Sequence, residues 1–145
     1  TLTHLKNFNV AIWGNGWKRS KLVPKHWIKG AAIYGHEACH AMSRGVVNLN
    51  ILREQNRDSH NMRTFEIPAT ASLMLTNRTA EQQRFFEEGI EILSYGSPEE
   101  MIDQIKLGIN SRNEAKRMGE RSYERVREET YAKRASEILH ATGLA

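Results

Sequence analysis

The stretch at residues 49–76 constrains the fold more than any other part of the sequence. An apolar run at residues 46–51 leads into it, a polar loop and a short helical segment follow, and a second apolar run occupies residues 73–75. The order of strand, loop, helix and strand is typical of a parallel unit, whose two strands need a crossover connection. In such units phosphate ligands bind where the first strand ends and the helix begins. We therefore expect the functional site in this stretch.

Short apolar runs alternate with helical segments along the rest of the chain. We expect further strands at residues 8–13, 26–32 and 90–93, and helices at residues 36–42 and 79–88. Between the first two strands, residues 18–25 are basic and contain a proline, so we expect a connection or a frayed helix there. The alternation predicts an α/β domain with a mostly parallel sheet.

The carboxy-terminal part of the chain is predicted to form a helical tail. The sequence Ser97-Pro98-Glu99-Glu100 favours a helix start, because serine caps free amides, proline suits the first helical position and acids suit the positive helix end. The helices that follow carry apolar faces with helical spacing. These faces consist of Met101, Ile102, Ile105 and Ile109, then Ala115, Met118, Ser122 and Val126, and last Tyr131, Ala135, Ile138 and Leu139.

The composition limits the class of protein. The 145 residues contain 39% hydrophobic and 26% charged residues, which is typical of one ordinary globular domain. The net charge of +4 suits a phosphorylated ligand, whereas nucleic acid is not an expected partner, because arginines alternate with glutamates along residues 112–127. A single cysteine, Cys39, excludes an internal disulfide framework and leads us to expect a cytoplasmic protein. No run has the length of an integral membrane segment.

A glycine turn follows the first expected strand. Gly14, Asn15, Gly16 and Trp17 come directly after residues 8–13. Glycine has no Cβ, so a ligand can approach the backbone here, as it does at the start of a nucleotide-binding unit. The third glycine of the dinucleotide fingerprint is missing, so a plain tight turn is an equally good interpretation.

His36, Glu37 and His40 form the pattern H-E-x-x-H of zinc hydrolases. On a helix the two histidines share a face and can hold zinc, while the glutamate activates the bound water. Glu54 or Glu66 is available as a third ligand. The longer forms of this motif need a glycine and a third histidine that the chain lacks at the required spacing. We therefore prefer a pair of surface histidines on a short helix and keep the zinc site as the alternative.

Polar residues of the central stretch can form a diphosphate site. We expect Asn61 to cap a helix that runs to about Ala69, so that free backbone amides and the positive helix end face the preceding loop. Guanidinium groups bind phosphate oxygens in a bidentate way, although each arginine alone can equally be an exposed surface charge. Glu66, one turn inside the helix, suits the two hydroxyls of a ribose. The arginines around this point are Arg53, Arg57 and Arg63.

The same stretch resembles a known family. Residues 49–69 read LNILREQNRDSHNMRTFEIPA and resemble the group 1 glycosyltransferases of the spore-maturation (CgeB-like) branch, whose carboxy-terminal half carries a similar N-x-R-T-F-E-x-x-A signature. The likeness covers nearly the whole chain. It extends to residues 73–76, to Tyr34-Gly35, to residues 85–89 and 91–95, to the helix start at Ser97 and to Thr130-Tyr131.

The resemblance implies the GT-B architecture, in which two Rossmann-like, three-layer domains face each other across a cleft and the second binds the nucleotide-sugar donor. Residues 1–145 are similar to that second domain, so we expect an amino-terminal acceptor domain to precede them. Family members contact the donor through two acids eight positions apart. Glu66 matches the second acid, which holds the ribose, and Asp58 takes the place of the first. Thr70-Ala71 replaces the usual Cys-Gly, and we expect its added Cβ to crowd the backbone beside the donor.

The expected function is that of the donor-binding domain of a glycosyltransferase, which moves a sugar from a nucleoside-diphosphate sugar such as a UDP-sugar to an unknown acceptor. Arg53 and Arg63 are expected to neutralise the leaving diphosphate, so no metal or other cofactor is needed and the nucleotide sugar is the substrate. Tyr34, Gly35 and the turn at residues 14–17 are expected near the base and the phosphates. A non-catalytic nucleotide-binding module of the same fold is the alternative.

Overall fold

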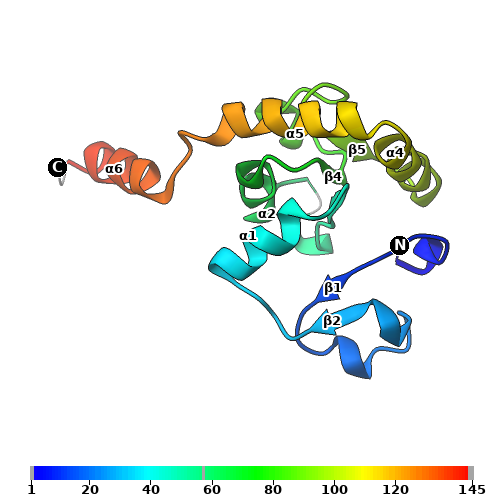
Figure 1. Cartoon of the computed structure of the whole chain (residues 1–145). Helices are drawn as coiled ribbons and strands as arrows, with labels where there is room; N and C mark the ends of the chain where they lie inside the picture. The colour runs from blue at the N-terminus through cyan, green and yellow to red at the C-terminus, as the bar shows by residue number, and fades with distance from the viewer. Residues whose placement is uncertain (1, 57, 144–145) are drawn as a thin grey trace.

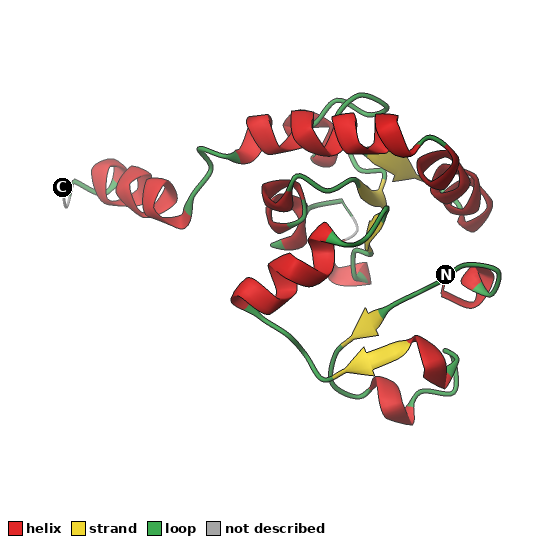
Figure 2. Ribbon diagram, viewed as in Figure 1, coloured by secondary structure: helices red, strands yellow, loops and turns green. Residues whose placement is uncertain are grey.

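The computed structural model describes residues 2–56 and 58–143, and it combines parallel strands with helices (Figures 1 and 2). β1 (Ile12–Trp13) pairs in parallel with β2 (Ile28–Gly30). β3 (Asn48–Asn50), β4 (Met74–Asn77) and β5 (Leu93–Tyr95) form a second parallel sheet with β4 in its centre. The predicted α/β class with parallel strands is confirmed, although the strands are divided between two sheets.

Helices connect the strands and form the carboxy-terminal part. α4 and α5 lie on one side of the three-stranded sheet, away from α1 (Figure 1). The helices are α1 (Gly35–Ser43), α2 (Arg63–Glu66), α3 (Gln82–Phe85), α4 (Pro98–Asn110), α5 (Arg112–Val126) and α6 (Tyr131–Ala141). Short 3-10 turns are η1 (Leu2–Leu5), η2 (Trp17–Arg19), η3 (Lys25–Trp27), η4 (Glu54–Asn56) and η5 (Pro68–Thr70). Within the described ranges, no helix combines the length and the apolar character that a membrane crossing requires.

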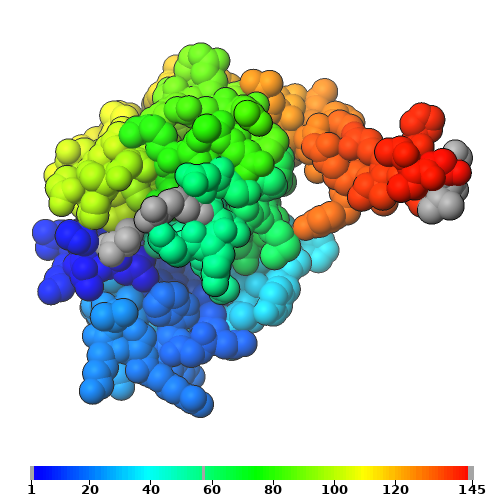
Figure 3. All heavy atoms as spheres, turned by 180° about the vertical axis from the view of Figure 1, so that it is seen from behind, coloured from blue at the N-terminus to red at the C-terminus, as the bar shows by residue number. Residues whose placement is uncertain are grey.

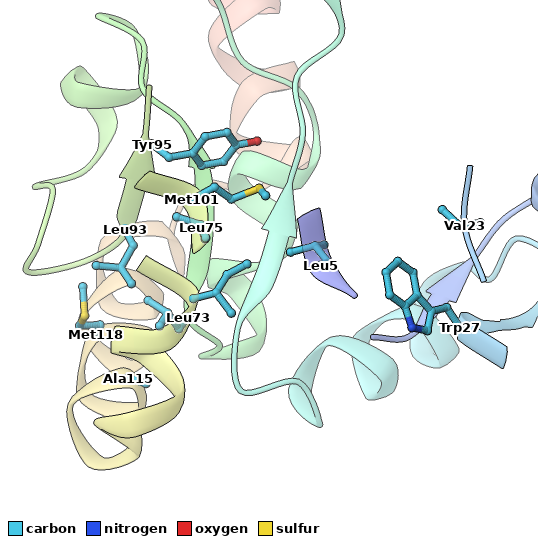
Figure 4. Packing of buried hydrophobic residues seen from close by; sticks show 11 residues of the cluster. Leu5, Val23, Trp27, Leu73, Leu75, Leu93, Tyr95, Met101, Ala115 and Met118 are labelled. Atoms are coloured by element: carbon cyan, nitrogen blue, oxygen red, sulfur yellow. The ribbon is translucent and has the colours of Figure 1, made fainter. Parts of the chain in front are cut away.

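β4 lies at the centre of the core. Met74 and Leu75 are 0% exposed, as expected for a strand that is covered on both faces. Successive side chains of a strand point to opposite faces, so Leu75 packs in one hydrophobic cluster and Met74 in another. Figure 4 shows Leu75 in the larger cluster near Leu93, with Trp27 farther away beside the two-stranded sheet. Because both faces of β4 are buried, the strand is held in the core and its carboxyl end has a fixed position.

The predicted faces of α4 and α5 are confirmed. Ser97 Oγ accepts a hydrogen bond from the Glu100 backbone N–H at 3.1 Å, and Pro98 is the first residue of α4. Met101 and Ile105 of α4 are buried. All four residues predicted to form the apolar face of α5 are also buried, namely Ala115, Met118, Ser122 and Val126.

α6 forms where the sequence predicts a helix, but its apolar face is not covered. Thr130 caps it by accepting a hydrogen bond from the Lys133 backbone N–H at 3.1 Å. Tyr131 is 76% exposed and Ile138 is 63% exposed, and no residue of α6 is buried. Figures 1 and 3 show α6 extending away from the rest of the molecule. Its amphipathic pattern therefore produces a helix without producing a contact with the core.

Several elements are shorter than the sequence predicts. The helix expected at residues 79–88 is reduced to α3, because Phe86 is extended (φ −138°) and turns its side chain into the core. The strand expected at residues 90–93 moves to β5, because Gly89 has a positive φ of 82° and the chain turns there. The helix expected from Asn61 to about Ala69 is divided into α2 and η5 at Pro68, whose ring nitrogen carries no N–H for the helical ladder.

Candidate functional site

A buried polar network fixes the loop between β3 and α2. Asn50, the last residue of β3, is 2% exposed, and its Oδ1 accepts a hydrogen bond from Asn61 Nδ2 at 2.9 Å. Thr64 of α2 is 0% exposed, and its Oγ1 accepts hydrogen bonds from Asn50 Nδ2 at 3.4 Å and from Gln82 Nε2 at 2.9 Å. Because unpaired buried polar groups cost free energy, this network favours one conformation of the loop. The start of α2 is thus held at the carboxyl end of β3.

Arg63 and Glu66 lie on one face of α2, next to this network. Arg63 Nη1 donates a hydrogen bond to Glu66 Oε2 at 2.6 Å, and the two side chains are 44% and 37% exposed. A guanidinium has five N–H donors and a carboxylate has two acceptor oxygens. The pair therefore keeps donors for phosphate oxygens and an acceptor for hydroxyl groups. The structure brings the predicted phosphate and ribose ligands together, and it joins them in one ion pair.

The prediction that Asn61 caps α2 is wrong. Met62 occupies the N-cap position, and no side chain accepts a hydrogen bond from the helix start. Asn61 Nδ2 donates instead to Asn50 Oδ1, and Asn61 Oδ1, the atom that would accept from the helix start, is buried and accepts no hydrogen bond from the described residues. α2 has only four residues, so its end carries little of a helix dipole. Side chains must therefore supply most of the attraction for a diphosphate, and Asn61 as a donor ligand stays a prediction.

Arg53 and Asp58 lie on the exposed loop that joins β3 to α2. The start of this loop is anchored, because the backbone N–H of Leu52 donates a hydrogen bond to Asn77 Oδ1 at the end of β4, at 2.8 Å. Arg57, the third arginine expected here, lies outside the described residues. Arg53 and Asp58 thus share one loop with Asn61, directly before the ion pair of α2.

The turn after β1 contains Gly14, Gly16 and Trp17. Gly14 (φ 150°) and Gly16 (φ 87°) both have positive φ, which glycine adopts without strain. A Cβ on Gly14 would lie 2.8 Å from Trp17 Nε1, so the indole covers the backbone of Gly14. A Cβ on Gly16 would meet nothing within 4 Å. Gly14 is therefore required by the packing of the turn itself, whereas the backbone of Gly16 is open to a ligand.

Tyr34 and Gly35 belong to the same end of the two-stranded sheet as this turn. Asn15 Oδ1 accepts a hydrogen bond from the backbone N–H of Ala32 at 3.3 Å, which links the turn to the segment that enters α1. Tyr34 is 75% exposed, and Gly35 has φ 51°. The predicted ligands thus form two groups, one after β1 and β2 and one after β3.

His36 and His40 are exposed on α1. In residues 2–56 and 58–143, no group of three His, Cys, Asp or Glu side chains is placed to hold a metal ion. Glu66, one of the two candidate third ligands, is paired with Arg63. The two histidines therefore form a surface pair on α1 without a third ligand in the described part of the chain.

The sequence patterns did not single out a contact between His60 and Glu81. His60 Nδ1 lies 2.9 Å from Glu81 Oε2, and both atoms are shielded from solvent. Such a contact needs a proton between the two atoms, so we assign a proton to Nδ1 of the imidazole. The hydrogen bond from His60 holds the pKa of Glu81 below its usual range. The rings of Phe65 and Phe85 contact the imidazole at centroid distances of 5.8 Å and 5.1 Å.

Arg78 follows β4 and is fully engaged in the structure. Its Nη2 donates a hydrogen bond to Glu88 Oε1 at 2.6 Å, and its guanidinium also donates to Glu100. These hydrogen bonds raise the pKa of Arg78 and lower the pKa of Glu100 to about 2. The charge of Arg78 is thus compensated by two carboxylates, and we assign it a structural role.

Ala71 lies between α2 and β4 and packs against α5. A Cβ on Gly119 of α5 would lie 2.4 Å from the Ala71 carbonyl oxygen, so the two backbones are in close contact. Ala71 also lines a shallow hollow whose other residues belong to α5. This segment enters β4 at its amino end, and its contact with α5 is made through the backbone of Ala71. The expectation that its Cβ crowds the backbone beside the donor stays a prediction.

The model of a family described as glycosyl transferase-like matches residues 1–140. The chain belongs to this glycosyl transferase-like family. A search among curated proteins and a search among solved structures both give no match. The match to the glycosyl transferase-like family includes the turn after β1, the loop after β3 and α2. The family match thus supports glycosyl transfer as the general activity of this domain.

Proposed function

We propose that this chain is the donor-binding domain of a glycosyltransferase that uses a nucleoside-diphosphate sugar, with UDP as the nucleotide. The observation that carries the proposal is the Arg63–Glu66 pair on α2, whose start is held at the carboxyl end of β3 by the hydrogen bonds of Asn50. In parallel α/β sheets, ligands bind at this end of the strands. Glu66 accepts hydrogen bonds from the ribose hydroxyls, and Arg63 turns its remaining donors toward the diphosphate.

The charge distribution supports an anionic ligand at the turn after β1. Residues 1–36 contain six lysines and arginines and no aspartate or glutamate, so the remainder of the chain is net acidic. This cationic part includes the Gly14–Trp17 turn and the start of α1. A positive field attracts a diphosphate, and it stabilises the charge that develops on the leaving diphosphate during transfer. Arg53, on the loop after β3, and Arg63, on α2, supply further N–H donors for the diphosphate, without a metal ion.

The rest of the reaction is assigned to another part of the protein. We place the acceptor-activating base in an amino-terminal domain that precedes Thr1, as in a GT-B enzyme of the spore-maturation (CgeB-like) branch, and we place the protein in the cytoplasm. The signature at residues 61–69 supports the branch, and the single Cys39, which is exposed, supports a reducing compartment. On this basis the isolated chain binds nucleotide weakly and transfers no sugar.

Isothermal titration calorimetry with UDP and GDP tests the proposal. We expect UDP to bind and Glu66→Ala to weaken it by about tenfold, since a charged hydrogen bond to the ribose is lost. Asp103→Ala is the matched control, because Asp103 is an exposed acid on α4, paired with Lys106 as Glu66 is paired with Arg63. If neither nucleotide binds at millimolar concentration, or if Glu66→Ala binds as the wild type does, the donor site is assigned wrongly. Binding without hydrolysis of UDP-sugars by the full-length protein would indicate a non-catalytic module.

A further inference from the structure

A hollow beside the proposed donor site has no role in the function described so far. It is a half-open hollow of about 370 Å³ between α2 and α6, at the lower end of the range of about 300–1,000 Å³ that is typical of small-molecule sites. Met62 and Phe65 form its α2 side, whereas Arg63 and Glu66 do not line it. Adjacent residues of a helix are turned by about 100° from each other, so the two surfaces are neighbouring faces of one helix. We call this hollow the α2–α6 pocket.

One wall of the α2–α6 pocket presents a fixed hydrogen-bonding group. His60 lines the pocket, and Phe65, Phe85 and Glu81 hold its ring on different sides. Its Nδ1 is shielded from solvent, yet 37% of the side chain is exposed, so the rest of the ring supplies the open surface. When the imidazole carries a proton on Nδ1 alone, its Nε2 can accept a hydrogen bond. The pocket thus offers a positioned acceptor to a hydroxyl group.

The opposite wall carries charges that are already compensated. Arg134 donates hydrogen bonds to Glu137 Oε2 at 2.9 Å and also to Glu129, and Lys133 Nζ donates to Glu129 Oε1 at 2.7 Å. The two cations are therefore matched by two carboxylates. A phosphate would find no unpaired cation on this wall, whereas hydroxyl groups can donate to the Glu129 carboxylate and accept from Arg134. These contacts favour a neutral, hydroxyl-rich ligand.

Aromatic and apolar side chains complete the pocket. Tyr131 is 76% exposed and Met62 is 65% exposed, and both line the pocket with Phe65. A pyranose ring has C–H groups on its face and hydroxyl groups around its edge, so it pairs with an aromatic surface that is surrounded by polar groups. We propose that the α2–α6 pocket binds a pyranose sugar, as a saccharide site separate from the nucleotide site. This inference rests on the proposed function, because it supplies the second ligand of a glycosyl transfer.

NMR titration of the whole chain with methyl glycosides of glucose, galactose and mannose tests this proposal. The readout is the imidazole resonances of His60, assigned with His60→Gln. We expect a saturable shift with at least one glycoside, and Tyr131→Ala should weaken the affinity by about tenfold, because the stacking surface is lost. Ile138→Ala is the matched control, since Ile138 is 63% exposed on the same helix and does not line the pocket. Sorbitol, which has hydroxyl groups but no ring face, should not shift His60.

The outcomes separate this inference from the proposed function. A saturable shift that Tyr131→Ala weakens and Ile138→Ala preserves supports the pocket. When the glycosides cause this shift, the pocket binds a sugar that carries no nucleotide, as an acceptor sugar does. A shift with UDP-glucose, but with neither UDP nor any glycoside, supports a saccharide pocket that holds the sugar of the donor. No saturable shift with any of these compounds, or a shift that Tyr131→Ala leaves unchanged, overturns the inference. If UDP fails to bind while the glycosides still shift His60, the donor site is wrong and the saccharide pocket stands.

Discussion

At the scale of single residues, the most unusual backbone conformation is that of Ala71. Its φ is 52°, in the left-handed region, and it is the only described residue other than glycine with a positive φ. A side chain in this region costs roughly 1–2 kcal/mol. The close approach of Gly119 to the Ala71 carbonyl explains why the strain is kept, because α5 and the η5 turn touch through their backbones. Packing of α5 therefore determines the conformation of Ala71.

Replacing Ala71 with glycine is expected to stabilise the protein. Glycine adopts this conformation freely but also gains freedom in the unfolded chain, so we expect a net gain of about 0.5–1 kcal/mol in the free energy of unfolding. Urea denaturation of Ala71→Gly measures the gain. Ala69→Gly is the control, because Ala69 is an exposed alanine of the same turn without a positive φ, and it should lose stability. A loss of stability in Ala71→Gly would mean that its Cβ makes a contact worth more than the strain.

At the scale of elements, Arg78 joins the end of β4 to two other segments. It bonds Glu88, which follows α3, and Glu100, which lies in the first turn of α4. The Glu100 Oε2 atom also accepts a hydrogen bond from the backbone N–H of Gly96 at 2.7 Å. One ion cluster thus connects β4, the segment before β5 and the start of α4.

This cluster should make stability depend on pH in the acid range. Hydrogen bonds from Arg78 and Gly96 lower the pKa of Glu100 from 4.5 to about 2 in the folded state. A lowered pKa means that the contribution of Glu100 is complete above about pH 4.5 and is lost as the pH falls toward 2. We expect the wild type to lose more stability than Glu100→Gln between about pH 6 and pH 3 in urea denaturation. Glu120→Gln, which replaces an exposed acid of α5, should lose as much stability as the wild type over this pH range. Equal losses in the wild type and in Glu100→Gln would refute the contribution of Glu100.

Local signals in the sequence predict the elements whose structure depends on local interactions. The cap at Ser97 and the apolar spacing of α4 and α5 are confirmed, because both arise within one helix and its buried face. The expected long helix after Asn61 fails at Pro68, and the cap at Asn61 fails because the Asn61 amide is oriented by its Nδ2 hydrogen bond to Asn50 Oδ1 instead of accepting from the helix start. The contact of His60 with Glu81 joins two separate segments, so only the folded chain shows it.

At the scale of the whole molecule, the sequence predicts the fold class better than the way the parts pack. The parallel α/β class is confirmed, and Arg63 and Glu66, which the sequence analysis expects in one site, form an ion pair on α2 that the sequence patterns did not predict. Whether short strands join one sheet or two depends on backbone pairing between distant segments, and β1 pairs with β2 through a register shift at Ile12 and Trp13. Amphipathic spacing likewise predicts α6 but not whether another element covers it.

Removal of α6 tests separately whether this helix contributes to the stability of the core and to sugar binding in the α2–α6 pocket. No residue of α6 is buried, so a chain that ends at Glu129 should retain its free energy of unfolding within about 0.5 kcal/mol. The Arg63–Glu66 pair remains in that chain, so UDP should bind as it does to the whole chain. The glycoside response of His60 should disappear, because Tyr131 and Arg134 are removed from the pocket. Urea denaturation, calorimetry with UDP and the NMR titration measure these three quantities on one variant. A large loss of stability would show that α6 belongs to the core, and retained glycoside binding would place the sugar elsewhere.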